Sequence, residues 1–172
     1  MVLRGPSRAE AVTIEMIPEN LREHAAAVAV DGFDHEALTG GHFDRGELTL
    51  EIAAAKIVSV CGFLKYDQKF VRLSSLTAVD RYPAEPRFEL VYHLHSIERT
   101  ERLRLKCRVP GTDPVIESVT SVWRSANWYE REVFDLFGVP FLNHPDLRRI
   151  MMPDDWEGHP LRKDYPVTGY RM

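Results

Sequence analysis

Hydrophobic and polar residues begin to follow a regular pattern at Glu47. Over residues 48–52, leucine and isoleucine alternate with polar side chains, which predicts a half-buried strand. Apolar residues then recur at helical spacing, which predicts a helix over residues 53–64. Residues 70–82 are rich in Val, Leu and Thr, so we expect them to be extended over much of their length, before a turn framed by prolines.

The clearest strands in the sequence follow that turn, and a short polar connection joins them into an antiparallel hairpin. Their inner face is predicted to carry Phe88, Leu90, Tyr92, Leu94, Leu103, Leu105, Cys107 and Val109. Their outer face is predicted to carry Glu89, Val91, His93, His95, Arg102, Arg104, Lys106 and Arg108. This outer face is either an ordinary charged surface or a surface that meets an acidic partner.

Two further helices are predicted, one on each side of this region. The first follows Pro18 and has its apolar stripe at Leu21, Ala25, Val28 and Ala29. The second begins near Asn127 and ends at Gly138, a glycine suited to a left-handed cap. Its inner stripe is predicted to be Ala126, Tyr129, Val133 and Phe137.

The order of these elements predicts an α+β fold, with a mostly antiparallel sheet and helices packed on one face in a ferredoxin-like layout. Residues 1–46 are expected to form an N-terminal lead-in with one helix and a Gly-rich loop over 31–46. Residues 47–138 form the α+β domain, and residues 139–172 form an extended, Pro-rich C-terminal docking arm. The arm carries large apolar side chains, so we expect it to lie against another surface.

Composition narrows the class of protein. The chain has 172 residues, of which 44% are hydrophobic and 28% charged, so it is expected to fold as a globular protein. Its formal net charge of −4 offers no surplus for a polyanion, which argues against nucleic acid as a partner. No apolar run approaches the ~18 residues of a membrane-spanning helix, and we identify no signal peptide. Any contact with a membrane is therefore expected to be indirect, through partners.

The sequence indicates no reaction centre. Cys61 and Cys107 are too few for an iron–sulfur cluster and are predicted to be small core residues. The sequence contains no phosphate-binding loop, dinucleotide fingerprint or GxSxG elbow. His93 and His95 share a strand face with four basic side chains, which disfavours a divalent metal. We therefore expect no catalytic, cofactor-binding or metal-binding residue in this chain.

A free-standing metal-dependent enzyme is the least favoured alternative. The C-terminal stretch contains possible ligands, but their spacing matches no helical metal motif, and each acid has a basic neighbour. The residues in question are His144, Asp146, Asp154, Asp155, Glu157, His159 and Asp164.

The charged residues of the second helix have two interpretations. Glu130, Arg131, Glu132 and Asp135 flank its apolar stripe and either face solvent or hold the start of the following arm. In the second case, the adjacent arginines at 148 and 149 are the expected partners of the carboxylates.

The same region carries a family resemblance. The motifs are Glu130-Arg131-Glu132, Asp135, Leu136-Phe137-Gly138, His144-Pro145-Asp146-Leu147-Arg148-Arg149-Ile150 and the continuation from Met152 to Pro166. This pattern resembles the 30-kDa subunit of NADH-quinone oxidoreductase, a hydrophilic subunit of respiratory complex I. The candidate signature and interface residues are Glu130, Arg131, Glu132, Asp135, Gly138, His144, Pro145, Asp146, Arg148, Arg149, Met151, Met152, Asp154, Trp156, Gly158, His159, Arg162, Lys163, Asp164 and Tyr165.

The resemblance implies a non-catalytic structural subunit in the peripheral arm of the complex. Such a subunit docks on the neighbour that forms most of the quinone cavity, which we call the quinone-cavity subunit, and supports electron transfer from NADH to quinone coupled to ion translocation. It carries no cofactor, because FMN and the iron–sulfur clusters belong to other subunits. In a bacterium it would lie at the cytoplasmic face of the cell membrane as a peripheral protein.

Two further expectations follow from the resemblance. Met151, Met152, Trp156 and Tyr165 are the expected apolar anchors of the arm, while its basic residues pair with acids on this domain or on the quinone-cavity subunit. The alternative is an equivalent subunit of a membrane-bound hydrogenase, or of a quinone oxidoreductase that does not take electrons from NADH.

Overall fold

A mainly antiparallel sheet of five strands forms the centre of the structure, a computed structural model that describes residues 18–168. The strands are β1 (Leu38–Asp44), β2 (Glu47–Ile52), β3 (Arg72–Asp80), β4 (Phe88–Ser96) and β5 (Glu101–Val109), in the order β1-β2-β5-β4-β3. The helices are α2 (Ala25–Phe33), α3 (Ile57–Tyr66) and α4 (Ala126–Phe137). Short 3-10 turns η1 (Glu19–Leu21) and η2 (Ala54–Lys56) precede α2 and α3, and β6 (Ile116–Glu117) pairs with β7 (Phe141–Leu142).

The predicted hairpin is confirmed by the antiparallel pairing of β4 with β5. Tyr92 lies opposite Leu105, and Leu90 opposite Cys107, with all four side chains buried on the inner face. Since side chains alternate across a strand, the same register places the basic residues of β5 on the outer face. Alternation in the sequence was sufficient to define this central part of the sheet.

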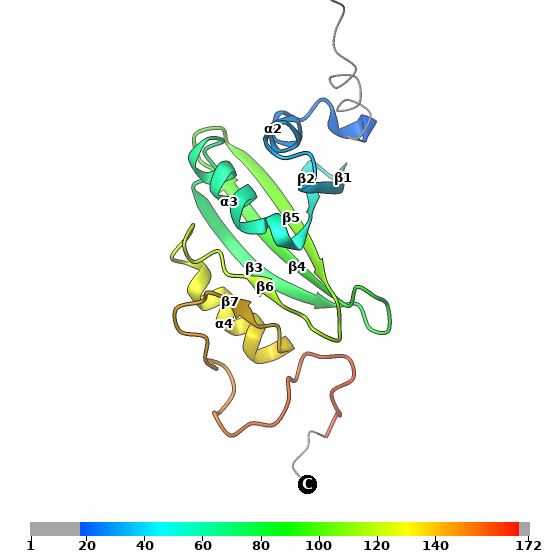
Figure 1. Cartoon of the computed structure of the whole chain (residues 1–172), viewed down its shortest axis with the longest axis vertical. Helices are drawn as coiled ribbons and strands as arrows, with labels where there is room; N and C mark the ends of the chain where they lie inside the picture. The colour runs from blue at the N-terminus through cyan, green and yellow to red at the C-terminus, as the bar shows by residue number, and fades with distance from the viewer. Residues whose placement is uncertain (1–17, 169–172) are drawn as a thin grey trace, which may run out of the picture.

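Helix α3 carries the chain from one side of the sheet to the other. Strand β2 lies parallel to β5, and α3 connects it to the far edge strand β3 (Figure 1). The helix buries Ile57, Val60, Cys61 and Leu64 against the sheet. The sequence placed this helix at 53–64; the structure has the 3-10 turn η2 first and the helix from Ile57 to Tyr66.

Helix α4 lies beside β3 at the lower end of the sheet (Figure 1). Its predicted inner stripe is buried at Ala126, Val133 and Phe137, while the Tyr129 hydroxyl donates a hydrogen bond to the Ser74 carbonyl of β3 over 3.0 Å. Gly138 follows the helix with φ 69°, as its predicted left-handed cap requires.

The ferredoxin-like layout is not confirmed. Three strands, β3 to β5, lie between α3 and α4, whereas a βαββαβ order has two strands there. Strand β1 also extends the sheet beyond β2. The general prediction of an α+β fold with a mostly antiparallel sheet is confirmed.

The loop predicted over residues 31–46 is wrong for most of its length. It contains β1, which pairs with β2 through a tight turn where Arg45 and Gly46 both have positive φ. Two glycines in a strand obscured the pattern, and Gly41 has a packing reason. A Cβ there would collide with the Thr49 carbonyl and with Leu21 of η1.

The first helix begins later than predicted. After Pro18 there is only the 3-10 turn η1, and α2 starts at Ala25. Its buried face consists of Ala26, Ala27, Val30 and Asp31, so the predicted stripe was placed on the wrong side, with Val28 46% exposed. The lead-in predicted for residues 1–16 lies outside the described residues.

We predict that Tyr92→Phe stabilises the protein by about 1 kcal/mol, because a buried hydroxyl without a partner destabilises the folded state. The Tyr92 side chain is fully buried, and its hydroxyl has no hydrogen-bond partner among the described residues. Urea unfolding of both variants measures the difference. A loss of stability in Tyr92→Phe would show that the hydroxyl has a partner.

Candidate docking surface at the end of helix α4

The carboxyl end of α4 needs hydrogen-bond donors from elsewhere in the chain. The last four carbonyls of an α-helix have no partner within the helix. Here the donors come from residues 143–168, which we call the C-terminal segment. His159 Nδ1 lies 2.9 Å from the Asp135 carbonyl, and the Leu161 amide lies 3.0 Å from that of Leu136. The Arg162 guanidinium donates to the carbonyls of Phe137 (2.5 Å) and Gly138 (3.0 Å).

These contacts also suit the helix electrostatically, because cations stabilise the negative carboxyl end of a helix dipole. Burial, with Arg162 and Arg149 nearby, lowers the pKa of His159, so its ring is neutral and donates through Nδ1. Gly138 is required for the close approach. A Cβ at this position would clash with the His159 ring and with Arg162, in addition to the strain of its positive φ.

Asp135 is the second anchor of the C-terminal segment. Its carboxylate accepts hydrogen bonds from the Ile150, Met151 and Met152 amides at 2.7–3.0 Å. It also forms an ion pair with Arg149 at 2.6 Å. Burial opposes ionisation of Asp135, but these bonds outweigh burial and lower its pKa. Asp135 therefore holds the segment as a carboxylate.

Arg131 adds a third contact from the same helix. Its guanidinium donates to the carbonyls of Arg148 (3.1 Å) and Arg149 (3.3 Å), and it lies over the exposed Trp128 ring. Of the two interpretations of the α4 charges, holding the following segment is confirmed for Asp135 and Arg131. Glu132 is exposed and makes no hydrogen bond or ion pair with any residue in 18–168.

Glu130 holds a different neighbour. Its buried carboxyl lies 2.6 Å from the Ser118 hydroxyl and 2.7 Å from the Val119 amide, so it fixes the loop between β6 and α4. His144 Nε2 is 3.8 Å away and donates to the Asn127 carbonyl, while its Nδ1 accepts the Asp146 amide. Burial raises the pKa of Glu130 to about 7 despite these hydrogen bonds.

The far end of the C-terminal segment is held by a buried ion-pair cluster that sequence reasoning missed. Arg87, just before β4, pairs with Asp80 of β3 at 2.7 Å and with Asp164 at 2.6 Å. The Lys163 amide donates to the same Asp80 carboxylate. Although burial opposes ionisation, Arg87 and the backbone donors lower the pKa of Asp80 to about 2. No local pattern connects residues so far apart in sequence.

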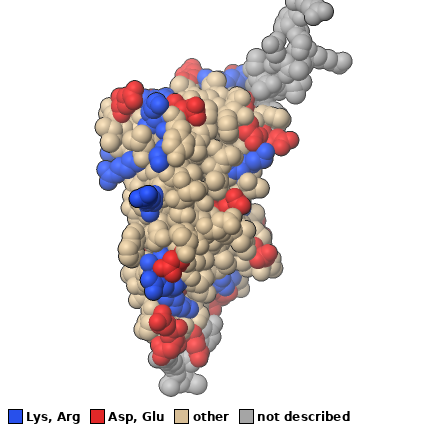
Figure 2. Space-filling view, turned by 60° about the vertical axis from the view of Figure 1, so that its left-hand side comes forward, with Lys and Arg blue, Asp and Glu red and all other residues tan. Residues whose placement is uncertain are grey.

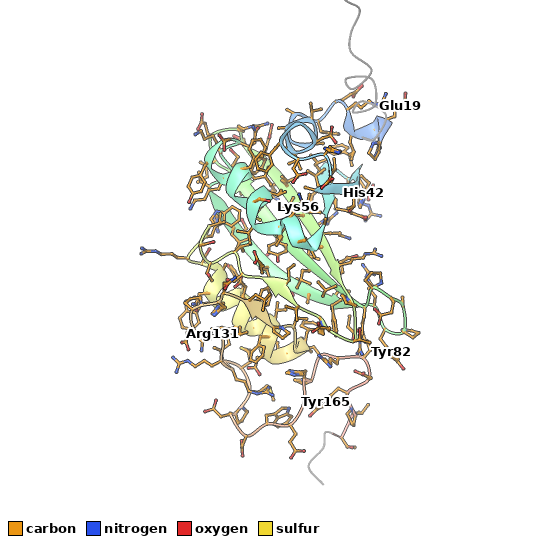
Figure 3. The ribbon with its side chains drawn as sticks, in the orientation of Figure 1. Glu19, His42, Lys56, Tyr82, Arg131 and Tyr165 are labelled. Atoms are coloured by element: carbon orange, nitrogen blue, oxygen red, sulfur yellow. The ribbon has the colours of Figure 1, made fainter. Side chains whose placement is uncertain are left out.

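Other predicted residues are less tightly held. Arg148, expected to pair with an acid of the helix, pairs with Asp146 at the exposed surface. Gly158 has φ 76° and accepts a hydrogen bond from Arg149, and the Tyr165 hydroxyl donates to Glu157. The exposed members of the predicted set include Pro145, Asp154 and the Lys163 side chain. Figures 2 and 3 show this end of the molecule, where basic and acidic side chains adjoin one another.

The extended arm is not confirmed as predicted. The C-terminal segment has no helix or strand, but it folds back on α4 and the end of the sheet instead of standing away from them. Several large apolar side chains of this region nevertheless stay about half exposed or more. We call them the C-terminal apolar surface: Trp128, Leu142, Met151, Leu161 and Val167. Trp128 was not identified from the sequence, because it lies off the inner stripe of α4.

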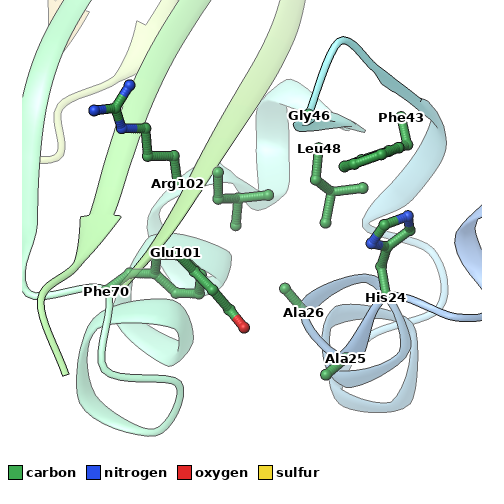
Figure 4. Close-up of a pocket in the computed structure, with 10 residues that line it drawn as sticks. His24, Ala25, Ala26, Phe43, Gly46, Leu48, Phe70, Glu101 and Arg102 are labelled. Carbon is green, nitrogen blue, oxygen red and sulfur yellow. The ribbon is translucent and has the colours of Figure 1, made fainter. Parts of the chain in front are cut away.

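Two features away from this region bear on chemistry. Cys61 and Cys107 are free and buried, and burial raises the pKa of each thiol. A cavity of about 190 Å³ lies between α2 and the sheet, where His24 packs on Phe43 above Leu48 (Figure 4). Within residues 18–168, no three His, Cys, Asp or Glu side chains are grouped so that they could hold a metal ion. None of the helices in this range is both long and apolar enough to cross a membrane.

The fold and these contacts define an α+β protein whose irregular C-terminal segment is built onto the end of one helix. The family model for the 30-kDa subunit of respiratory-chain NADH dehydrogenase matches residues 50–171. The chain belongs to this family.

Similar curated proteins are NADH-quinone oxidoreductase subunits of the same kind. The corresponding subunit of Geobacter sulfurreducens is 56% identical over 126 residues, which cover 73% of this chain and 78% of the relative. That of Cereibacter sphaeroides is 45% identical over 156 residues, covering 90% of this chain and 76% of the relative.

Two solved structures are also similar. A trypsin-resistant fragment of Nqo5 has a TM-score of 0.55 and 34% identity, covering 59% of this chain and 83% of the fragment. A chain of the membrane-bound sulfane sulfur reductase, an archaeal respiratory membrane complex, has a TM-score of 0.68 and 26% identity, covering 94% of this chain and 87% of its own length.

Replacing Asp135 tests the second anchor. We expect Asp135→Asn to lower the free energy of unfolding by about 3 kcal/mol, because it leaves Arg149 without its carboxylate and weakens the acceptor of three amides. Limited trypsin digestion should then cut more readily at Arg148 and Arg149. Glu132→Gln, on the exposed side of the same helix, is the control and should change stability by less than about 0.5 kcal/mol. Equal effects of the two substitutions would contradict the assignment.

The raised pKa of Glu130 predicts a pH dependence of stability. The folded state binds a proton that the unfolded state releases between the ordinary carboxyl pKa and about 7, so stability falls as pH rises through this window. We expect wild type to lose roughly 2–3 kcal/mol relative to Glu130→Gln between about pH 5 and pH 8. The difference between the variants removes the contribution of His144. Urea unfolding measures it, and Glu117→Gln is the exposed control. A difference independent of pH would show that Glu130 is not protonated in the folded state.

Proposed function

We propose that this chain is a non-catalytic structural subunit of the peripheral arm of an NADH-quinone oxidoreductase. In this role it docks on the quinone-cavity subunit and supports electron transfer from NADH to quinone coupled to ion translocation. FMN and the iron–sulfur clusters would belong to other subunits. In a bacterium, the chain would lie at the cytoplasmic face of the cell membrane and contact it only through the complex.

The observation that carries this proposal is the C-terminal apolar surface. Large apolar side chains in contact with water are expected at sites of protein association. Here Met151 and Leu161 are 61% and 48% exposed, yet they lie on a backbone held by Asp135 and by the end of α4. A partner that covers such a surface loses little conformational entropy in ordering it. Of the predicted anchors, Met151 fits this role best.

A second candidate is supported by one comparison. The chain resembles a subunit of the membrane-bound sulfane sulfur reductase over nearly its whole length. An equivalent position in a membrane-bound hydrogenase, or in a quinone oxidoreductase with another electron donor, would use the same docking surface. A free-standing metal enzyme gains no support, because His144 and His159 both bond to backbone groups.

We predict that Met151→Glu combined with Leu161→Glu lowers the yield of the quinone-cavity subunit that co-purifies with this chain by about ten-fold, because two charges would be buried in the interface. The experiment uses the whole complex, with the tagged chain expressed among its native partners. Both side chains are exposed, so the stability of the isolated chain should change little.

Ile97→Glu is the matched control. Ile97 is 66% exposed in the β4–β5 turn, at the end of the sheet away from the C-terminal segment, and its substitution should leave assembly unchanged (Figure 1). Normal recovery of the quinone-cavity subunit with the double variant would contradict the docking proposal. Equal loss with Ile97→Glu would also contradict it, because the effect would then not be specific to this surface.

A further inference from the structure

The outer face of the sheet holds one row of basic side chains without an acidic partner. The register places Arg72 of β3 opposite His95 of β4, and His95 opposite Arg102 of β5. The three side chains therefore form one cross-strand row on the face away from the core. Both arginines are exposed and His95 is half-buried. None of the three has an ion pair with a carboxylate in the described part of the chain.

Neighbouring rows on the same face are neutralised. Glu89 is buried beneath Arg81, Lys106 and Arg108, at 2.8–3.1 Å from each. Glu47 pairs with Arg104 at 2.7 Å and lies 4.0 Å from His93 Nε2. Because like charges directly opposite on a sheet are destabilising, a row without its own acid is the exception on this face.

The unpaired row borders a cavity. A hollow of about 430 Å³ is lined by this row together with Ser74, Ser75, His93 and Glu47. The Ser75 hydroxyl and His93 Nδ1 lie 3.0 Å apart at its wall. The β3–β4 register shifts between Leu73 and Ser75, so a bulge lies at the edge of the hollow. Hydroxyl, imidazole and guanidinium donors thus surround a space that contains one carboxylate, and that carboxylate is already paired with Arg104.

We propose that this hollow, with Arg72, His95 and Arg102 as its basic row, binds an acidic segment of a neighbouring polypeptide. Arginine is suited to paired hydrogen bonds with carboxylates. The two arginines are attached to strands two positions apart, about 10 Å at ordinary strand spacing, which is wider than one carboxylate or phosphate group. Two acidic side chains of one segment match this spacing better than a single small anion. The site is distinct from the C-terminal apolar surface and does not depend on which partner covers that surface.

The test is a titration of the isolated full-length chain, labelled with ¹⁵N, at low salt. The probes are hexaglutamate, hexaglutamine and inorganic phosphate at matched ionic strength. Hexaglutamate should shift the backbone amide signals of residues 72–75, 93–96 and 101–104, while hexaglutamine should leave them in place. We expect Arg72→Gln combined with Arg102→Gln to weaken hexaglutamate binding by about ten-fold, because two charge-assisted contacts are lost.

Arg45→Gln combined with Arg124→Gln is the control, since it removes two exposed charges outside the row and should change the affinity by less than about two-fold. Unchanged amide signals, or unchanged affinity in the Arg72/Arg102 double variant, would overturn the proposal. Phosphate binding at the same residues as tightly as hexaglutamate would also overturn it in favour of a small-anion site. Since the assay needs no other protein, its result is independent of whether the chain docks on the quinone-cavity subunit.

Discussion

The carboxyl end of α4 is the constraint on which the C-terminal half of this structure depends. Four carbonyls at that end would lack partners, and a segment more than twenty residues further along supplies donors for all of them. Each satisfied bond contributes about 1 kcal/mol, and a buried carbonyl left without a partner costs more than that. A backbone with no helix or strand of its own is thereby given a defined path. The helix and the segment therefore stabilise each other.

This mutual arrangement explains how a small domain can present a large and irregular surface. Asp135 and the Asp80–Arg87–Asp164 cluster hold the segment near its two ends, and the helix end holds it between them. Polar groups turned toward the domain are satisfied, while Met151 and Leu161 remain in water. Such a division is expected where a chain is one member of a larger assembly, as in the family to which this chain belongs.

The sequence predicted those features that depend on local patterns. Alternation placed β4 and β5, helical spacing placed α4, and Gly138 marked the end of α4. The pairing of Asp135 with Arg149 was predictable because only a short stretch separates them. Strand β1 was missed because Gly40 and Gly41 interrupt alternation, and the reason for Gly41 is its contact with a distant turn. Arg87 and Trp128 were missed for a similar reason, since their importance comes from partners or exposure that the folded chain alone defines.

Amide hydrogen exchange of the isolated full-length chain tests most directly whether the segment is part of the folded domain before any partner binds. The account predicts that the amides of Leu161 and of residues 150–152 exchange at least ~100-fold more slowly than in an unfolded peptide, in step with the last turn of α4. Exchange of these amides at the unfolded rate, with α4 still protected, would contradict it.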